Sequence, residues 1–332
     1  MLTLCKSNQR KEHMTMELIK IGVDVGNYDT KTQNCTVISG YKKYETKPEI
    51  ATKVLEYDNA WYVPDISERR PYVADKTNDD QCLILTLFGI AEELLYLAKK
   101  ELQNEYGKSL QDKLNEYRAI ELGLGLPPGH FNSLASKTLD YYNRKFSEEV
   151  SFTYRKFKFR FRVEKIKLFP QDFTAVYKNK ESQVAKKKDY YIVGIGGGTV
   201  DVVPVSKGQP DVNNCFSLEM GTRVMYRKIC ADIQRAYGEM LDEVLVEDVL
   251  REEETVLPEK ITTMIKENAK KYYRDMISGC IQQGIKLSLY PVVFFGGGAL
   301  LLKDSIKNDD RIINPEIITD INANAKAYAS CL

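Results

Sequence analysis

Three glycine-containing turns carry most of the side chains in this sequence whose types and spacing could do chemistry. The first reads DVGNYDTK over residues 24–31 and directly follows the apolar run LIKIGV. A glycine just beyond a strand lets backbone N–H groups close around a phosphate, because no Cβ obstructs the anion. Lys31 can add a positive charge, and Asp24 suits magnesium, which prefers oxygen ligands and usually keeps several waters. Alone, such a turn is more often structural, so its function depends on partners elsewhere in the chain.

The second turn, Gly196, Gly197, Gly198 and Thr199, lies between two apolar stretches and is followed by Asp201. Consecutive glycines weaken a strand pair, so they need a compensating reason. One interpretation is a tight hairpin, which glycines favour. The other is a second phosphate-binding turn that faces the first, and the presence of both turns favours this phosphate clamp.

The third turn, Gly296, Gly297 and Gly298, follows PVVFF and precedes ALLL. It could let a flat base or a ribose lie against the backbone, or it could be a strand-to-helix turn that needs close packing. None of the three turns matches the P-loop pattern or the dinucleotide pattern Gly-x-Gly-x-x-Gly. The chemistry they indicate is therefore phosphate binding outside those two motif classes.

Strands and helices must position these turns, and hydrophobic periodicity predicts both. A strand is predicted over 17–26, another over 117–126, and a strand pair over 149–169. Short strand candidates between the first two are Thr36–Ile38, Tyr41–Thr46, Lys53–Tyr57 and Ala60–Val63. Helices are predicted over 80–105, 132–146, 221–237 and 257–283, with shorter ones within 170–186, 239–254 and 320–330. Because strands, a glycine turn and helices occur in this order twice, we expect an α/β fold of two similar domains with a cleft between them.

Composition excludes several classes of function. With 48 basic and 47 acidic side chains the net charge is +1, which argues against a protein built to coat a polyanion. Only His13 and His130 are present, so a histidine triad or a His-rich metal site is not expected. The seven cysteines form no close pair, which fits a reducing, cytoplasmic location. The apolar stretch that begins at Cys82 is shorter than the ~20 residues of a membrane span.

The three turns, in this order and spacing, resemble those of the actin, sugar-kinase and heat-shock-ATPase superfamily. DVGNYDTK is similar to its first phosphate loop, GIGGGTVD to its second and FFGGGALL to its adenosine motif. FPQDFTAVY and NANAKAYA resemble its two helices that connect the domains. The set spans nearly the whole chain after Met16 and is most similar to the bacterial plasmid-partition proteins of the ParM type.

This resemblance implies two ribonuclease-H-like (actin-fold) domains that flank a nucleotide cleft. The implied boundaries are a flexible leader at 1–15, domain I at 16–171 and domain II at 172–317, with a C-terminal helix at about 318–332 completing domain I.

The resemblance also implies roles for residues at matching positions. The nucleotide would be ATP or GTP with Mg²⁺, and the metal would lie at Asp24 and Asp201. The adenosine would lie on Gly296–Gly298. Gln171 would orient the attacking water with its amide, which suits slow hydrolysis because an amide is not a strong base. The residues implied at the phosphates are Gly26, Asn27, Tyr28, Asp29, Thr30, Lys31, Gly196, Gly197, Gly198 and Thr199.

One position departs from the family pattern. The second phosphate loop normally begins with an acid, and here that position is Gly194. A carboxylate that would help to hold magnesium and water is therefore missing from the loop, although Asp201 could carry part of its role. On the sequence alone we expect bound nucleotide but slow hydrolysis, and we expect Gly194→Asp to raise the turnover rate severalfold.

The function implied by the resemblance is an ATP-dependent, filament-forming bacterial actin homologue. It would polymerise with nucleotide, bind an adaptor protein on centromere-like plasmid DNA and segregate the plasmid, without direct DNA binding and without a membrane. The alternative is a monomeric actin-fold kinase or assembly ATPase. Light scattering after addition of ATP and magnesium distinguishes them, because only polymers raise the signal.

A basic stretch, Lys156–Arg162, alternates Lys or Arg with apolar residues. It could contact a neighbouring subunit of a filament, for example the acidic segment Glu239–Glu254. It could instead be the solvent face of an edge strand, where Lys and Arg discourage aggregation. The edge-strand interpretation is favoured.

Overall fold

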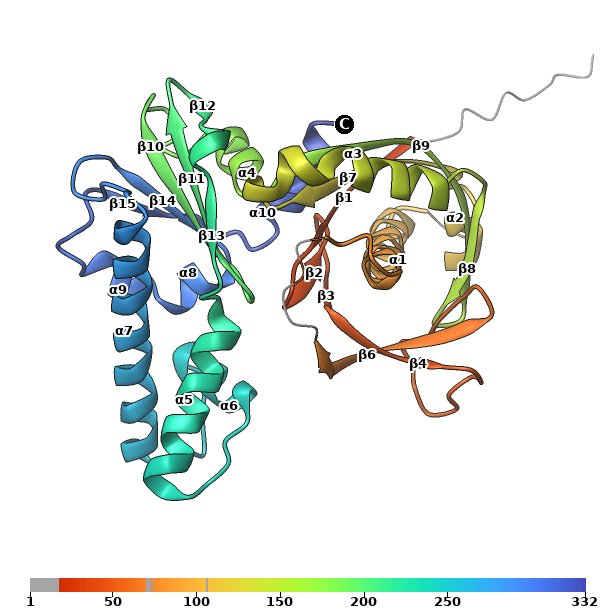
Figure 1. Cartoon of the computed structure of the whole chain (residues 1–332). Helices are drawn as coiled ribbons and strands as arrows, with labels where there is room; N and C mark the ends of the chain where they lie inside the picture. Colours follow the sequence, from red (N-terminus) through yellow and green to blue (C-terminus); the bar gives the residue numbers. More distant parts are fainter. Residues whose placement is uncertain (1–17, 70–72, 74, 106) are drawn as a thin grey trace, which may run out of the picture.

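Two β-sheets organise the chain into two lobes (Figure 1). The computed structural model describes residues 18–69, 73, 75–105 and 107–332. The large sheet has nine strands in the order β3-β2-β1-β7-β9-β8-β5-β6-β4, and the small sheet has the order β12-β11-β10-β14-β15 with β13 paired to β11. The flexible leader expected at residues 1–15 lies outside the described residues.

The large-sheet lobe uses the first half of the chain. Its elements are β1 (Leu18–Val25), β2 (Asp29–Lys31), β3 (Thr36–Ile38), β4 (Gly40–Tyr44), β5 (Leu55–Tyr57), β6 (Ala60–Arg69), α1 (Gln81–Leu102), α2 (Leu110–Leu114), β7 (Ala119–Leu126), α3 (Pro128–Lys145), β8 (Val150–Tyr154) and β9 (Phe157–Pro170).

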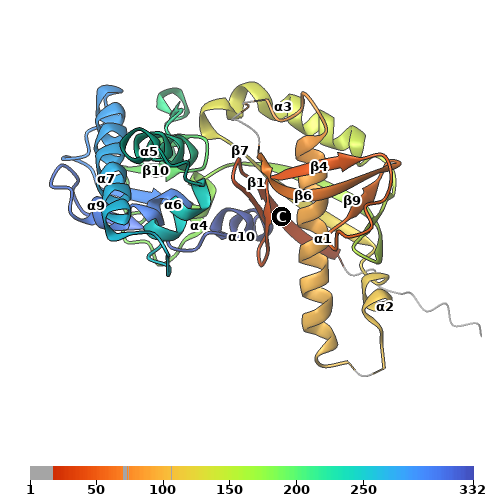
Figure 2. The same cartoon turned by 90° about the horizontal axis from the view of Figure 1, so that it is seen from below.

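The small-sheet lobe uses most of the second half. Its elements are α4 (Phe173–Lys178), β10 (Tyr190–Ile195), β11 (Val200–Ser206), β12 (Gln209–Pro210), a 3-10 turn (Val212–Asn214), β13 (Phe216–Leu218), α5 (Thr222–Tyr237), α6 (Glu243–Leu250), α7 (Glu259–Gln282), β14 (Val292–Phe295), α8 (Gly297–Leu301), α9 (Lys303–Lys307) and β15 (Pro315–Ile317). The last helix, α10 (Ala323–Ser330), lies between the lobes (Figure 2).

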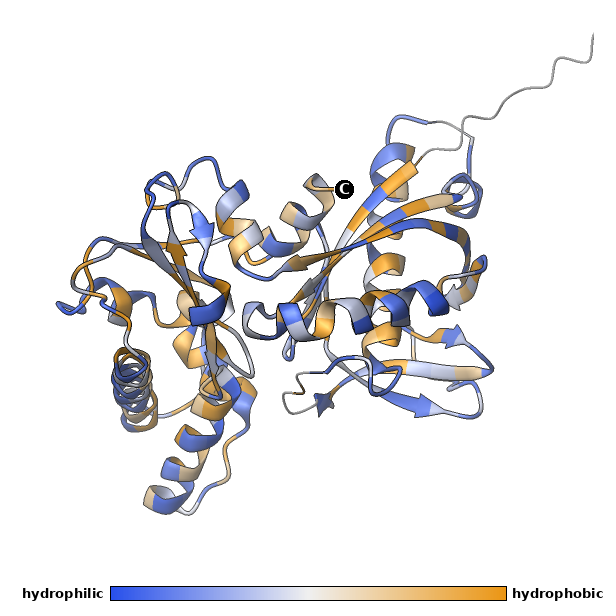
Figure 3. Cartoon of the chain, turned by 45° about the horizontal axis from the view of Figure 1, so that its top comes forward, coloured by the Kyte–Doolittle hydropathy of each residue, from blue (hydrophilic) through white to orange (hydrophobic). Residues whose placement is uncertain are grey.

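Helix α1 forms the centre of the large-sheet lobe, and the sheet curls around it (Figure 1). Apolar residues gather on the strands and on this helix (Figure 3). In the described part of the chain, α1 is the one helix that is long and apolar enough to cross a membrane. It is longer than the apolar stretch that begins at Cys82 in the sequence. However, 72% of its most apolar window is buried inside the protein, as in the core helix of a domain. Its buried residues surround the helix instead of forming the single expected face.

Several boundaries differ from those predicted. Helix α3 begins at Pro128 and not near 132, because proline is well suited to the first helical turn, where no N–H is needed. The acidic segment 239–254 is helical only over α6. The helix after β9 ends at Lys178, well before the lysine run at 186–188. Strand β6 continues to Arg69 and is therefore longer than the candidate Ala60–Val63.

The basic stretch lies on β9, which is an interior strand and not a simple edge strand. Its first half pairs with β8 and its second half with β7. The first half of β9 pairs only with β8, and its other edge is covered by the side chain of Gln111 on α2. Its amide donates to the carbonyl of Lys158 at 2.8 Å and accepts from the Lys158 N–H at 2.9 Å. The edge is thus closed by a side chain, and Lys158, Arg160 and Arg162 remain exposed.

Helix α10 packs against β1, β7 and α4, so residues near 325 reach elements near both 20 and 175. The approach to β1 is very close: a Cβ on Gly22 would lie 1.9 Å from the carbonyl oxygen of Ala325. Any larger residue at 22 would therefore push the helix away. Tyr328 stacks on Phe169 of β9 with ring centroids 5.4 Å apart, which fixes the far end of the helix.

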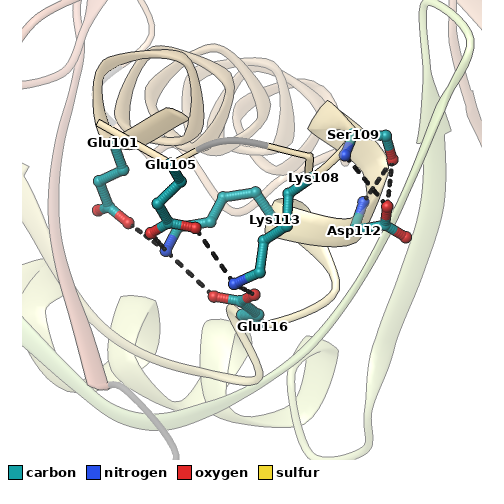
Figure 4. A network of polar contacts seen from close by, with 7 residues as sticks. All are labelled: Glu101, Glu105, Lys108, Ser109, Asp112, Lys113 and Glu116. Carbon is teal, nitrogen blue, oxygen red and sulfur yellow. Dashed lines mark hydrogen bonds and ion pairs between the residues drawn. The ribbon is translucent and has the colours of Figure 1, made fainter. Parts of the chain in front are cut away.

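A polar network joins the end of α1 to α2 (Figure 4). Lys113 lies at its centre with only 6% of its side chain exposed, and it forms ion pairs with Glu101 at 2.7 Å, Glu105 at 3.0 Å and Glu116 at 3.1 Å. The hydrogen bond to Glu101 is the main cause that raises the pKa of Lys113, so this side chain stays charged. One buried cation therefore bridges three carboxylates, and Lys108 adds a second positive charge at Glu105 and Glu116.

We predict that Lys113→Met destabilises the protein, because three carboxylates would then face one another without their shared cation. The melting temperature should fall by about 4 °C, as when a well-ordered pair loses one partner. The control is Lys108→Met, which removes a lysine that is 45% exposed from the same carboxylates and should shift the melting temperature by only about 1 °C. Equal shifts in thermal unfolding would contradict the central role of Lys113.

Candidate functional site

The three glycine turns meet at one cavity between the two sheets. Strands β1, β7 and the second half of β9 run parallel, as do β10 and β14, so their carboxyl ends share one edge in each sheet. Ligands of open α/β sheets bind at such edges. The cavity has an empty volume of about 1060 Å³, which includes space open to solvent. Of the predicted site residues, it is lined by Asp24, Gly26, Asn27, Tyr28, Asp29, Lys31, Gln171, Gly196, Gly197, Thr199, Asp201, Gly296, Gly297 and Gly298.

Two predicted residues do not line the cavity. Thr30 lies on β2 between Asp29 and Lys31, so its side chain points to the opposite face of the sheet. There it is 1% exposed, and its hydroxyl is 2.9 Å from that of Ser39. Gly198 is turned away, and its carbonyl accepts from the N–H of Gly221 at 3.1 Å.

The first turn begins where β1 ends. Lys31 is the direct cross-strand neighbour of Asp24, which brings the predicted cation and the predicted metal ligand together. Within the described residues no ion pair engages Lys31, so its charge is available to a bound anion. Both oxygens of Asp24 accept hydrogen bonds, one from the amide of Gln171 at 2.6 Å and one from that of Asn324 at 3.1 Å.

The second turn is a hairpin between β10 and β11 and also lines the cavity, so the two interpretations of its glycines are compatible. Its carbonyl groups are held by the start of α5: the N–H of Thr222 donates to Gly196 at 2.9 Å, and that of Arg223 to Gly197 at 3.0 Å. The N–H of Gly197 has no acceptor among the described residues. Carbonyls bound behind the turn and an N–H group left available are what an anion-binding loop requires.

The third turn connects β14 to the short helix α8. Gly296 has φ +91°, a conformation that side chains disfavour, and a Cβ there would lie 2.7 Å from the carbonyl oxygen of Ile195. The strand-to-helix interpretation therefore describes its local geometry. The turn nevertheless lines the same cavity as the other two, next to Leu301 and Tyr226.

Three carboxylates surround one end of the cavity. Burial, followed by the charge of Asp201, raises the pKa of Asp172 to about 8. Burial also raises the pKa of Asp201, which is opposed by hydrogen bonds from Ser217 and Thr199. The third carboxylate is Asp24. Such mutually repelling buried acids favour the binding of a cation between or beside them.

The space at Gly194 is already filled. A Cβ on this glycine would lie 1.8 Å from Oδ2 and 2.8 Å from Cγ of Asp172. A side chain at 194 would collide with the carboxylate of Asp172 in this conformation, so Gly194→Asp would require Asp172 to move, and the expected rise in turnover stays a prediction.

Several cavity residues were not identified from the sequence. Lys76 comes from an irregular loop, and its ammonium group donates to the carbonyl of Val25 at 2.6 Å. No sequence pattern indicated it. Asp172 and Asn324 lie within the connecting segments FPQDFTAVY and NANAKAYA, respectively. The sequence signal that could have identified Asp172 was an acid next to Gln171, together with the missing acid at position 194. The remaining additional residues that line the cavity are Pro127, Thr222, Tyr226, Glu247, Arg251, Leu301 and Ile321.

Tyr28 connects the lobes across the cavity. Its hydroxyl donates to Glu247 of α6, and the guanidinium of Arg69 lies 3.5 Å from the centre of its ring. Its Cβ would be 2.7 Å from a Cβ on Gly197, so the first two turns are in contact. Burial and the bond to Glu247 raise the pKa of Tyr28, which keeps its hydroxyl protonated. A second connection is the bond from Arg223 to the carbonyl of Arg69 at 3.2 Å.

Magnesium suits this set of side chains. Among the described residues no group of three or more His, Cys, Asp or Glu forms a metal cluster. Magnesium, however, is usually held by one or two carboxylates together with phosphates and water. Asp24 and Asp201 both face the cavity, on opposite sheets, and can supply those carboxylates.

We predict that Tyr28→Phe loosens the cleft, because it removes the bond to Glu247 and keeps the ring that stacks on Arg69. Amide hydrogen exchange over residues 26–31 and 243–250 should be about tenfold faster in protein without added nucleotide. Tyr44→Phe, on the exposed strand β4, should leave both segments unchanged. If Tyr28→Phe also left them unchanged, the contact with Glu247 would not hold the lobes together.

Comparisons with known proteins agree with this arrangement. Residues 192–308 match the family described as archaeal actin homologue MreB-like, C-terminal. A sequence comparison with curated proteins finds no match. The chain is similar in structure to Ta0583, an archaeal actin homologue, with 16% identity, a TM-score of 0.72, and 94% of this chain and 98% of that chain covered.

Two ParM proteins are also similar. For the pSK41 ParM protein the identity is 14% and the TM-score 0.63, with 95% of this chain and 96% of that chain covered. For Bacillus thuringiensis ParM with AMPPNP the values are 15% and 0.63, with 95% and 98% covered. The chain therefore has the actin fold, and its structure is similar to those of the archaeal actin homologue and the ParM proteins.

Proposed function

We propose that this chain binds ATP with magnesium in the cavity between its lobes, hydrolyses it slowly and polymerises when nucleotide is bound. The observation that carries the proposal is the meeting of two glycine turns from opposite sheets, with Lys31 available on one side and the N–H of Gly197 on the other. A triphosphate between them would be bound by both lobes at once.

Each part of the site has a proposed role. Lys31 and the N–H of Gly197 would bind the phosphates. Asp24 and Asp201 would hold magnesium, which neutralises phosphate charge when bound. Gln171 donates its amide N–H to Asp24, which leaves its amide oxygen to accept a hydrogen bond from a water and orient it.

The nucleoside would lie beside the third turn. Gly296–Gly298 offer backbone without side chains, while Tyr226 and the ion pair between Arg251 and Glu247 line the opposite wall. Entry of a nucleotide would separate Tyr28 from Glu247, since this contact crosses the cavity. Nucleotide binding and the relative position of the lobes are therefore coupled in this proposal.

Similar proteins support both halves of the proposal. Ta0583 has been solved in complex with ADP, Bacillus thuringiensis ParM with AMPPNP, and Alp12 as a filament. In a filament, the nucleotide-bound shape would favour the contact between copies, so polymerisation would follow nucleotide binding. An adaptor protein on centromere-like plasmid DNA as partner is proposed from the likeness to ParM proteins.

We also propose the domain boundaries at 16–171 and 172–317, with the C-terminal helix completing the first domain. The packing of α10 against β1 and β7 supports this assignment.

The test measures nucleotide binding and light scattering on the same samples. ATP with magnesium should raise the scattering, which then decays slowly as ATP is hydrolysed. Lys31→Ala should weaken ATP affinity about tenfold or more, because a charge-assisted contact with phosphate is lost, and should reduce scattering in parallel. The control is Lys20→Ala, which removes a half-exposed lysine of β1 whose pair with Glu121 is long, at 3.9 Å.

Two results would contradict the proposal. Absence of ATP and GTP binding would refute the nucleotide site. Binding with a flat scattering trace, together with phosphate transfer to a small molecule, would favour a monomeric kinase of the same fold.

A further inference from the structure

We propose that Asp172 is a catalytic residue of this protein, and that the lack of a side chain at Gly194 leaves the space that the carboxylate of Asp172 occupies. The inference rests on the proposed nucleotide hydrolysis and names the group that accepts the proton of the attacking water. It concerns a residue that belongs neither to the glycine turns nor to the pair of expected metal ligands.

The first argument is the mutual exclusion of two side chains. Gly194 is near the end of β10, and Asp172 precedes α4, so the two residues come from different elements. A Cβ on Gly194 would lie 1.8 Å from Oδ2 of Asp172. With Asp172 in this conformation there is no room for a side chain at 194, so position 172 supplies the carboxylate at this point of the cavity.

The second argument is the way the carboxylate is held. Oδ1 of Asp172 accepts from the amide of Asn324 at 3.1 Å, and the N–H of Asp172 donates to the amide oxygen of Asn324 at 2.9 Å. Oδ2 has no donor among the described residues, although the residue is only 8% exposed. Since Asp172 lines the cavity, this oxygen is available to a molecule bound there.

The third argument is the backbone. Asp172 has φ 60° and ψ −50°, a region that side chains rarely adopt. The conformation is imposed by its surroundings: Val176 donates to its carbonyl at 3.0 Å, and Asn324 holds both its N–H and its side chain. Glycine would fit this backbone better, so the retention of an acid calls for another reason. Such strained residues cluster at functional sites.

The surroundings of Asp172 match the proposed chemistry. It follows Gln171, whose amide is free to orient water on one side, and Asn324 links it to Asp24. The charged groups that act on it are Asp24, Asp201 and Lys31.

The proposed step is the hydrolysis of ATP by a water molecule. The oxygen of water forms a bond to the terminal phosphorus of ATP while the bond from that phosphorus to the bridging oxygen breaks. The proton of the water moves to Oδ2 of Asp172, and the electron pair of the broken bond stays on ADP. Release of the proton to solvent, with departure of phosphate, restores the carboxylate. Because burial raises the pKa of Asp172 to about 8, the carboxylate form that accepts the proton becomes more populated at higher pH, and hydrolysis should become faster as the pH rises through that value.

The main test uses Asp172→Asn, which keeps the shape and removes the proton acceptor. Single-turnover hydrolysis of ATP should fall about 100-fold or more, while the affinity for AMPPNP with magnesium should change less than about threefold. Asp140→Asn, an exposed acid on α3, is the control and should leave both unchanged. Hydrolysis by Asp172→Asn at the rate of the unmodified protein would overturn the proposal, and so would loss of AMPPNP binding together with hydrolysis.

A second test moves the carboxylate between the two positions. The double variant, Asp172→Gly with Gly194→Asp, should hydrolyse ATP at least tenfold faster than Asp172→Gly alone. If the double variant recovers none while it still binds AMPPNP, the two positions do not carry one shared function.

A third measurement needs no nucleotide. Asp172→Gly should raise the melting temperature, because glycine adopts the positive φ of this position with less strain than aspartate. A fall would indicate that Asp172 serves the structure, which overturns the proposal. Failure of the proposed function itself is distinguishable, since the unmodified protein would then bind neither ATP nor AMPPNP.

Discussion

The amide of Asn324 is the contact on which the arrangement of the site depends. It donates to Asp24 of the large sheet and to Asp172 before α4, and it accepts from the Asp172 backbone. A single side chain on α10 therefore holds two carboxylates, one at the end of β1 and one directly before α4. This is possible only because Gly22 lets α10 lie directly on β1. The buried charges would otherwise repel each other without a partner to orient them.

The same cavity is also where the two lobes are joined. Tyr28, Arg69 and Glu247 connect the first turn to α6, and the start of α5 holds the second turn from behind. The groups that would bind phosphate are thus built into the contacts that fix the angle between the lobes. A change at the phosphate end cannot remain local in such a structure, because packed elements move as units. Chemistry in the cavity and the outer shape of the molecule are mechanically connected.

The sequence predicted the fold and much of the cavity lining, and the reasons are local. Apolar strands that end in glycine turns can be recognised from neighbouring residues, and parallel strands bring those turns to one edge. Thr30 was assigned to the phosphates because it lies within the turn motif, but strand alternation directs its side chain into the core. Helix ends differed where proline starts or local charge stops a helix, since such boundaries depend on packing.

Other features could not be predicted because they exist only in three dimensions. The vacancy at Gly194 was visible in the sequence, but its filling by Asp172 depends on a positive φ and on a helix from the far end of the chain. Lys76 reaches Val25 from an irregular loop 51 positions away, and no periodicity marks it. Residues of this kind are recognised by where the fold places them and not by their neighbours in sequence.

The bond between Asp24 and Asn324 joins residues 300 positions apart. During synthesis on the ribosome, the strands of the first lobe emerge long before α10, so the cavity is completed only after α10 has emerged. Contacts of such long range also close slowly, because much chain entropy must be lost before they form. Until then the newborn chain would carry a cavity in which the carboxylate of Asp24 lacks the amide that orients it.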